Sequence, residues 1–176
     1  MKAAYYRAAD LDGLLAKAAE LSARTLVFDI EPLVAYWDNG QQALDTGVQR
    51  ILAEAVTVPG VEVVCFSTNS IRRPSTMPSH PGVRVVYLAH ARKPLWTAPY
   101  AEFPKPGVVI GDQVATDGLL ATRLGYTFMD YRPAHIRRPW GPRLLDYGGR
   151  MARPLLFRHS RGAGPGGHLP DGHKAP

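Results

Sequence analysis

The sequence has very little cysteine and no long apolar run. Cys65 is the single cysteine among 176 residues, so an intrachain disulfide is excluded and a reducing cytoplasm is the simplest location. No apolar stretch approaches the roughly 20 residues that a membrane-spanning helix needs. Residues 1–10 carry charges and lack an apolar signal core, so we expect no secretion signal. These absences favour a globular cytoplasmic protein.

The first 133 residues also lack a charge excess of either sign, since they hold 13 basic and 13 acidic side chains. Residues 134–176 hold eight Lys and Arg against two Asp and Glu, which accounts for the whole net charge of +6. A basic end can contact nucleic acid, an anionic membrane or nothing. Here the arginines alternate with Leu, Met and Phe, which suits an anionic membrane surface better than a DNA backbone. We therefore expect no specific nucleic-acid partner.

Five β-type runs alternate with helix-like stretches between residues 11 and 129. The runs are short, rich in β-branched or aromatic residues, and bounded by Gly, Pro or polar residues. They cover residues 25–28, 61–66, 83–88, 107–110 and 126–129. Helix-like stretches with apolar residues at helical spacing cover residues 11–21, 41–56 and 114–124. This alternation predicts an α/β fold, doubly wound, with a five-stranded parallel sheet covered on both faces.

The regular pattern ends near Pro133. We predict one domain over residues 1–133, a basic and partly amphipathic extension over residues 134–160, and a disordered Gly-, Pro- and His-rich tail over residues 161–176. Three interpretations stay open for residues 143–157: docking on a membrane surface, packing against the folded body, and disorder. Gly and Pro within this stretch weaken it as a helix.

Polar residues stand where three of the predicted strands end. Asp29 and Glu31 follow the first strand, residues 67–69 (Ser-Thr-Asn) follow the second, and Asp112 follows the fourth, with Asp117 in the next helical turn. Ligands of parallel sheets bind beyond these carboxyl ends. Carboxylates suit a hard cation such as Mg²⁺, and small hydroxyl and amide groups suit phosphoryl oxygens. The pattern therefore indicates a phosphoryl-transfer site.

Each signal has an ordinary alternative when taken alone: a solvated turn, a helix cap, or, for Lys93, an exposed lysine. Their order and spacing are more specific, because Asp29-x-Glu31, Ser67-Thr68-Asn69, Lys93-Pro94 and Gly111-Asp112-x₄-Asp117 resemble the four motifs of the haloacid dehalogenase (HAD) superfamily. The stretches FDIEPLVAYWD, RKP and IGDQVATDGLLATRLGY are similar to its YqeG-type branch of small phosphatases without a large cap domain. The resemblance covers residues 5–133.

The resemblance implies a phosphomonoester hydrolase that works through an aspartyl-phosphate intermediate. In this scheme Asp29 attacks phosphorus, and Glu31 protonates the leaving group and then activates water. Ser67 hydrogen-bonds a phosphoryl oxygen, and Lys93 neutralises charge on Asp29 and the phosphate. Thr68 and Asn69 complete the substrate-binding set.

The same resemblance implies a Mg²⁺ cofactor. The ion would lie between Asp29, the backbone carbonyl of Glu31 and Asp112, with Asp117 acting through water or from the second coordination shell. The implied substrate is a small phosphorylated compound or a phospholipid head group. The implied location is cytoplasmic, with peripheral contact of the basic extension with the inner membrane surface as the open alternative.

The first motif departs from the HAD pattern at Glu31, where the family has Asp, and at Leu33, where it usually has Thr or Val. The extra methylene of Glu31 moves the proton donor by about 1 Å, and misplacement on that scale can cost on the order of 100-fold in rate. A second hypothesis therefore stays open: a catalytically degenerate HAD-fold protein that serves as a phosphate- or partner-binding scaffold.

Overall fold

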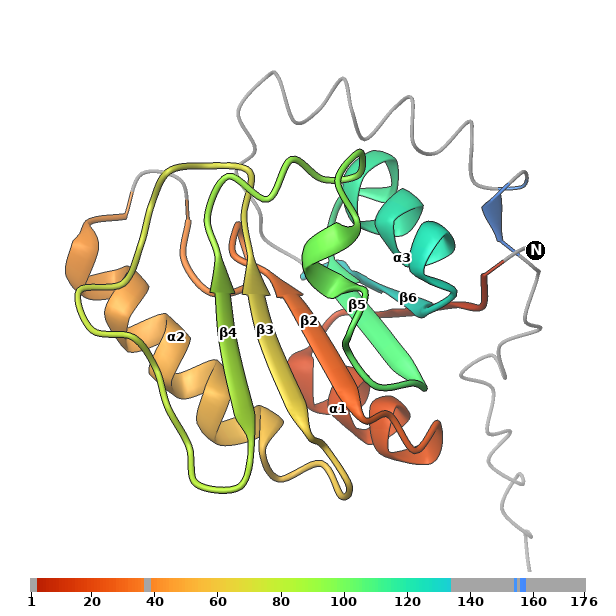
Figure 1. The fold of residues 1–176 in the computed structure, drawn as a ribbon, viewed down its shortest axis with the longest axis horizontal. Helices are drawn as coiled ribbons and strands as arrows, with labels where there is room; N and C mark the ends of the chain where they lie inside the picture. The colour runs from red at the N-terminus through yellow and green to blue at the C-terminus, as the bar shows by residue number, and fades with distance from the viewer. Residues whose placement is uncertain (1–2, 37–38, 134–153, 155, 158–176) are drawn as a thin grey trace, which may run out of the picture.

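The computed structural model describes residues 3–36 and 39–133, together with residues 154, 156 and 157 (Figure 1). Within these residues the chain forms β1 (Tyr5–Ala8), α1 (Leu11–Glu20), β2 (Thr25–Asp29), α2 (Gln41–Ala55), β3 (Val63–Ser67), β4 (Arg84–Leu88), the 3₁₀ turn η1 (Ala98–Tyr100), β5 (Gly107–Gly111), the π-helical turn η2 (Val114–Gly118), α3 (Leu119–Leu124) and β6 (Thr127–Tyr131).

The strands form one parallel sheet of six strands in the order β1-β6-β5-β2-β3-β4. The α/β class and the parallel sheet are confirmed, and no cap domain interrupts the described chain. The prediction of five strands was wrong by one. The missed strand, β1, has only four residues, and it is defined by its pairing with β6 rather than by a distinctive local pattern.

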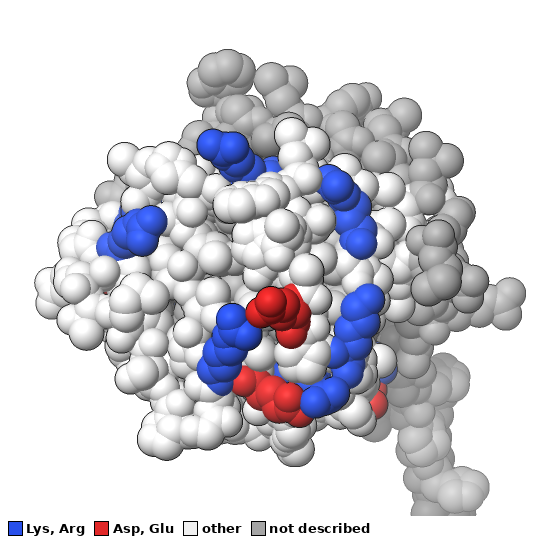
Figure 2. Space-filling view, viewed as in Figure 1, with Lys and Arg blue, Asp and Glu red and all other residues white. Residues whose placement is uncertain are grey.

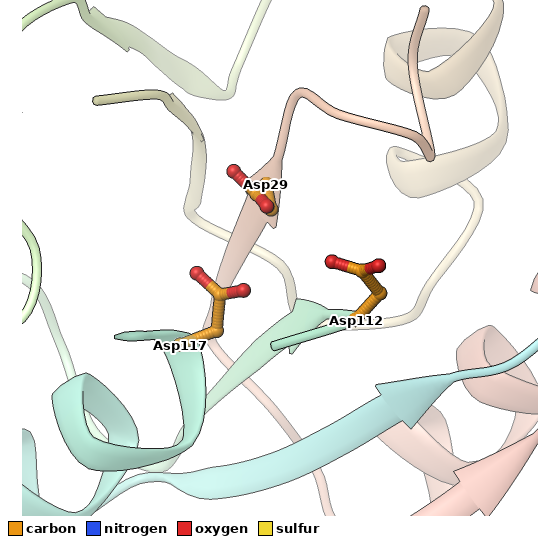
Figure 3. A group of neighbouring side chains, drawn as sticks. All are labelled: Asp29, Asp112 and Asp117. Atoms are coloured by element: carbon orange, nitrogen blue, oxygen red, sulfur yellow. The ribbon is translucent and has the colours of Figure 1, made fainter. Parts of the chain in front are cut away.

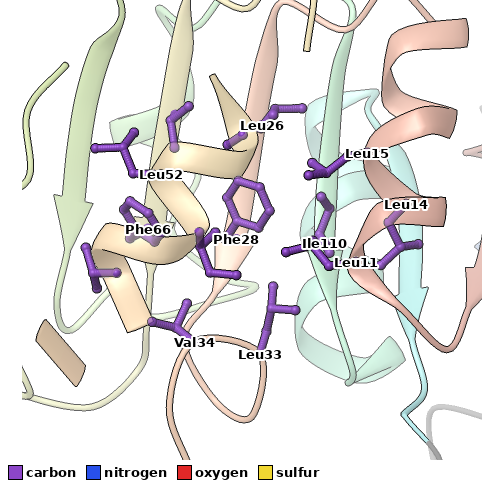
Figure 4. Close-up of a cluster of buried hydrophobic side chains, with 14 of the residues drawn as sticks. Leu11, Leu14, Leu15, Leu26, Phe28, Leu33, Val34, Leu52, Phe66 and Ile110 are labelled. Carbon is purple, nitrogen blue, oxygen red and sulfur yellow. The ribbon is translucent and has the colours of Figure 1, made fainter. Parts of the chain in front are cut away.

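One face of the sheet is covered by α1 and α2. Their apolar stripes pack on alternate residues of β2 and β3, and Phe28 stacks on Phe66 with ring centroids 5.9 Å apart (Figure 4). Gly47 of α2 lies against the segment that follows β2, where a Cβ would come 2.1 Å from the carbonyl oxygen of Val34. The glycine therefore lets α2 pack directly on the backbone that leads away from Asp29.

The opposite face is covered by η1, η2 and α3, which pack on Val27, Cys65 and Val109. The C-terminal region joins this second core at Phe157, which is buried and packs on Tyr5 and Phe128 with ring centroids 5.3 and 5.5 Å apart. Of the three interpretations of residues 143–157, packing against the folded body is the one that the burial of Phe157 supports at this position. The rest of the predicted extension and tail, apart from residues 154 and 156, lies outside the described residues.

The chain changes direction across the sheet between β2 and β5. From β2 it proceeds to β3 and β4 on one side, and then crosses to β5 and β6 on the other. Such a switch point opens a crevice at the carboxyl ends of the strands, where doubly wound proteins bind ligands. In Figure 1 the arrowheads of β2 to β5 point to the same end of the molecule.

No helix within the described residues is long and apolar enough to cross a membrane. On the face shown in Figure 2, Lys and Arg side chains form no single large patch, and some of them lie beside acidic side chains. This distribution agrees with the even balance of charges that the sequence has over residues 1–133.

Candidate functional site

Lys93 lies at the centre of the polar residues that the strand ends bring together. Its Nζ donates to Oδ1 of Asp29 and Oδ1 of Asp117, each at 2.7 Å, and to the carbonyl oxygen of Ser67 at 3.1 Å. Asn69 holds the Lys93 backbone: its side-chain oxygen accepts from the Lys93 amide at 2.7 Å, and its side-chain nitrogen donates to the Lys93 carbonyl at 3.1 Å. The ammonium group is thus fixed between two buried carboxylates.

A third carboxylate, that of Asp112, completes an acidic cluster. Asp29, Asp112 and Asp117 are all buried, and each offers an oxygen within 4.8 Å of the others (Figure 3). Asp29 ends β2, Asp112 follows β5, and Asp117 belongs to η2. Such carboxylate oxygens are the ligands that a hard divalent cation prefers, and the cluster could hold one. The Glu31 carboxylate is not part of it.

The π-helical turn η2 is what brings Asp117 into the site. The amides of Thr116, Asp117 and Gly118 all donate to the carbonyl of Gln113, at 3.3, 2.8 and 3.3 Å, which makes a wider turn than an α-helix has. Gly111 provides the space, because a Cβ there would lie 2.4 Å from Oδ2 of Asp117. The Gly-Asp-x₄-Asp spacing therefore combines a required glycine with a turn that folds its last carboxylate back toward β5.

The charges in the cluster strongly affect one another. Burial, followed by the negative charge of Asp117, raises the pKa of Asp29 well above its usual range, although Lys93 opposes this shift. Burial would lower the pKa of Lys93, but the carboxylates of Asp117 and Asp29 outweigh that effect and the pKa is raised. Lys93 therefore stays protonated, and its single positive charge is shared by the carboxylates of Asp29 and Asp117. A bound cation would supply further positive charge to these carboxylates.

Glu31 points to a different set of partners from those of Asp29. Its Oε2 accepts a hydrogen bond from the Thr68 hydroxyl at 2.9 Å, and its Oε1 lies 3.7 Å from Nη1 of Arg72. The two carboxylates of the first motif thus have separate cationic neighbours, Lys93 for Asp29 and Arg72 for Glu31.

A pocket of about 220 Å³ opens above these groups. Its lining combines the acids and Lys93 with neutral polar residues from the loops after β3 and β5; these residues are Asp29, Glu31, Thr68, Asn69, Ser70, Lys93, Gln113 and Thr116. Oδ1 of Asp29 is bound to Lys93 and to the Ile30 amide, at 2.7 and 3.0 Å, whereas no hydrogen bond of the described residues engages Oδ2. The pocket thus gives access to the Asp29 carboxylate, of which only Oδ1 is hydrogen-bonded within the described residues.

Ser67, which was predicted to bind a phosphoryl oxygen, does not line the pocket. Its hydroxyl is fully buried and lies 2.6 Å from the hydroxyl of Tyr100 in η1. The reason is the two-residue period of a strand, which places Ser67 on the same face as Cys65, toward the second core. A hydrogen bond from Ser67 to a phosphoryl oxygen would require its hydroxyl to turn away from Tyr100.

Sequence reasoning missed Arg72, Tyr100, Ser70, Gln113 and Thr116 as members or neighbours of the site. Gln113 and Thr116 stand inside the Gly-Asp-x₄-Asp motif, so their position was a usable signal. Arg72 and Tyr100 had no such signal, because a loop arginine and a lone tyrosine have many ordinary roles.

Comparisons of the chain with protein-family models, with curated proteins and with solved structures found no match.

Proposed function

We propose that this chain is a Mg²⁺-dependent phosphomonoester hydrolase of the HAD type, with Asp29 as the nucleophile. The observation that carries the proposal is the arrangement around Lys93. One buried ammonium group touches Asp29 and Asp117 at 2.7 Å beside a third carboxylate, below a pocket lined by hydroxyl and amide groups. These are the parts that transfer of a phosphoryl group to a carboxylate requires.

In the first step, Oδ2 of Asp29 forms a bond to phosphorus, and the bond from phosphorus to the ester oxygen breaks. Glu31, in its protonated form, gives its proton to the departing oxygen. The products are an alcohol and an aspartyl-phosphate on Asp29, and Lys93 offsets negative charge beside the reacting carboxylate. Thr68 and Asn69 line the pocket, and their side chains bond Glu31 and the Lys93 backbone, so they would shape the phosphoryl site chiefly by holding these two residues.

In the second step, water attacks the phosphorus of the intermediate and gives a proton to Glu31. The acyl phosphate bond breaks, inorganic phosphate leaves, and the Asp29 carboxylate is restored. Asp29 and Asp112 would hold the Mg²⁺, with Asp117 oriented by Lys93 nearby. When bound, the ion would supply positive charge against the phosphoryl oxygens.

The pocket suits a small phosphorylated compound or a phospholipid head group, and its lining residues do not distinguish between the two. A specific nucleic-acid partner is not part of the proposal. A cytoplasmic location and peripheral contact with an anionic membrane stay proposals, since nearly all of residues 134–160 lies outside the described part of the chain.

Vesicle co-sedimentation tests the membrane contact. The variant should replace Arg143, Arg150 and Arg153 with Gln rather than delete the segment, because a deletion would also remove the buried Phe157.

The proposal is tested by hydrolysis of p-nitrophenyl phosphate with and without Mg²⁺. We expect Mg²⁺-dependent turnover in the wild type and a loss of at least about 1,000-fold in Asp29→Asn, since the amide is a poor nucleophile. Asp12→Asn is the matched control, because Asp12 is exposed on α1 and far from the site in the chain. Turnover that survives Asp29→Asn would exclude Asp29 as the nucleophile.

The degenerate scaffold remains the second candidate, and the longer side chain of Glu31 is the feature that favours it. Beryllium fluoride with Mg²⁺ mimics a phosphoryl group bound to a carboxylate. A scaffold would be stabilised by this mixture in a thermal unfolding assay and would hydrolyse no phosphoester. An enzyme would be stabilised by the mixture and would also hydrolyse phosphoesters, and Asp29→Asn would lose both the stabilisation and the hydrolysis.

A further inference from the structure

The loop that follows β3 holds the carboxylate of Glu31 from two sides. The hydroxyl of Thr68 donates to Oε2 at 2.9 Å, and the guanidinium group of Arg72 lies 3.7 Å from Oε1. Arg72 is itself fixed, because its Nη1 and Nη2 donate to the backbone carbonyls of Tyr36 and Asn39 at 3.0 and 2.8 Å. The guanidinium group is therefore oriented by the same segment that carries Glu31.

Hydrogen bonds within the loop fix these two side chains relative to each other. The Ser70 amide donates to Oγ1 of Thr68 at 3.0 Å, and the Arg72 amide donates to Oγ of Ser70 at 3.3 Å. The Tyr87 hydroxyl donates to the carbonyl of Arg72 at 3.0 Å, which anchors this first part of the loop to β4. The Thr68 hydroxyl has one hydrogen, and a carboxylate can only accept, so this hydrogen points to Glu31. In the contact between the hydroxyls of Thr68 and Ser70, which are 3.1 Å apart, Ser70 is then the donor.

We propose that Thr68 and Arg72 are positioning residues that hold Glu31 as the acid and base of the hydrolysis. The inference rests on the proposed function and extends it. Glutamate has one more rotatable bond than the aspartate expected at this position, so its carboxylate needs an external restraint to reach one reactive geometry. Contacts on both oxygens provide that restraint and accommodate the extra methylene.

A purely structural role for Arg72 is the alternative, because the residue also ties the loop after β2 to the loop after β3. The two roles differ in what they affect. A structural tie contributes to stability whatever residue stands at position 31, whereas a positioning residue contributes to turnover only while Glu31 is present.

The experiment compares kcat and KM for p-nitrophenyl phosphate, with saturating Mg²⁺, in wild type, Thr68→Val and Arg72→Met. Each substitution keeps the approximate size of the side chain and removes one contact with Glu31. We expect kcat to fall on the order of 10- to 100-fold, the cost of a misplaced acid and base, with KM changed less than about 3-fold. Arg73→Met is the matched control, because Arg73 is the exposed neighbour and loses the same charge; its kcat should stay within about 2-fold of wild type.

A double-mutant cycle with Glu31→Gln separates positioning from structure. In the Glu31→Gln background, adding Arg72→Met or Thr68→Val should change the remaining kcat less than about 2-fold. Arg72→Lys should recover part of the rate that Arg72→Met loses, because it restores a positive charge near Oε1. Glu31→Asp should lower kcat, since a carboxylate withdrawn by about 1 Å would lose both contacts.

Three results would overturn this inference alone: an active wild type whose Thr68→Val and Arg72→Met variants keep its kcat, equal losses from these substitutions with and without Glu31, or a rate gain in Glu31→Asp. A wild type that hydrolyses no phosphoester would instead end the proposed function, whether or not beryllium fluoride and Mg²⁺ stabilise it, and this inference with it.

Discussion

The space beside Gly111 is occupied by the carboxylate of Asp117: a Cβ at Gly111 would lie 2.4 Å from Oδ2 and 2.6 Å from Cγ of Asp117. Real atoms do not approach so closely, so any side chain at this position must displace the carboxylate that holds Lys93. One residue without a side chain thus sets the geometry of the acidic cluster.

Gly111→Ala should therefore damage the site more than a single methyl group suggests. We expect a loss of about 1–3 kcal/mol in the free energy of unfolding, from overpacking in a closed site. We also expect a smaller rise in melting temperature on adding Mg²⁺. Gly40→Ala is the control, because nothing lies within 4 Å of a Cβ at Gly40. Equal Mg²⁺ responses in the two variants would show that Asp117 does not need this space.

Removing the charge of Lys93 should destabilise the protein, because Asp29 and Asp117 would remain buried without their shared cation. For Lys93→Met we expect a loss on the order of 3 kcal/mol in denaturant unfolding. Mg²⁺ should recover part of it by neutralising the same carboxylates, and should stabilise the variant more than the wild type. Lys105→Met, at an exposed position, is the matched control. A variant as stable as wild type, or one insensitive to Mg²⁺, would contradict the expectation.

Phe157 should contribute to the stability of the body although it lies beyond the predicted domain boundary at residue 133. Its ring is 4% exposed and packs on Tyr5 and Phe128, so Phe157→Ala should cost about 3 kcal/mol by leaving a cavity in the second core. Ile71→Ala, at a position that is 71% exposed, should change stability by less than about 0.5 kcal/mol. If the two substitutions were equally mild in denaturant unfolding, Phe157 would not belong to the core.

Cys65 should make the stability of the protein fall at alkaline pH. Burial raises the pKa of its thiol to about 12, whereas an unfolded cysteine titrates near pH 8.5. Above pH 8.5 the unfolded state loses a proton that the folded state keeps, so the free energy of unfolding decreases as pH rises. Between pH 7.5 and 9.5 the wild type should lose about 1 kcal/mol more than Cys65→Ala, as measured by denaturant unfolding. Parallel curves for the two proteins would show that the thiol titrates normally when folded.

Several features of the fold could be predicted because they depend on neighbours in the chain. The β-branched runs at residues 107–110 and 25–28 correspond closely to β5 and β2, and the apolar spacing of residues 41–56 corresponds to α2. The positions of Asp29 and Asp112 at the ends of strands could be predicted for the same reason. Parallel strands place their carboxyl ends at one edge, so the meeting of these two acids follows from the predicted fold.

Other features depended on contacts between distant segments. β1 exists because it pairs with β6 more than 120 residues away, and the role of Phe157 depends on the space beside Gly118 and Phe128. Arg72 and Glu31 are separated by 41 positions in the chain and meet because the loops after β2 and β3 lie side by side. The residue types and strand periods alone determined the parallel α/β class and the candidate acids. Only the tertiary structure decided which cation each acid faces, because that depends on how the loops pack and not on any local pattern.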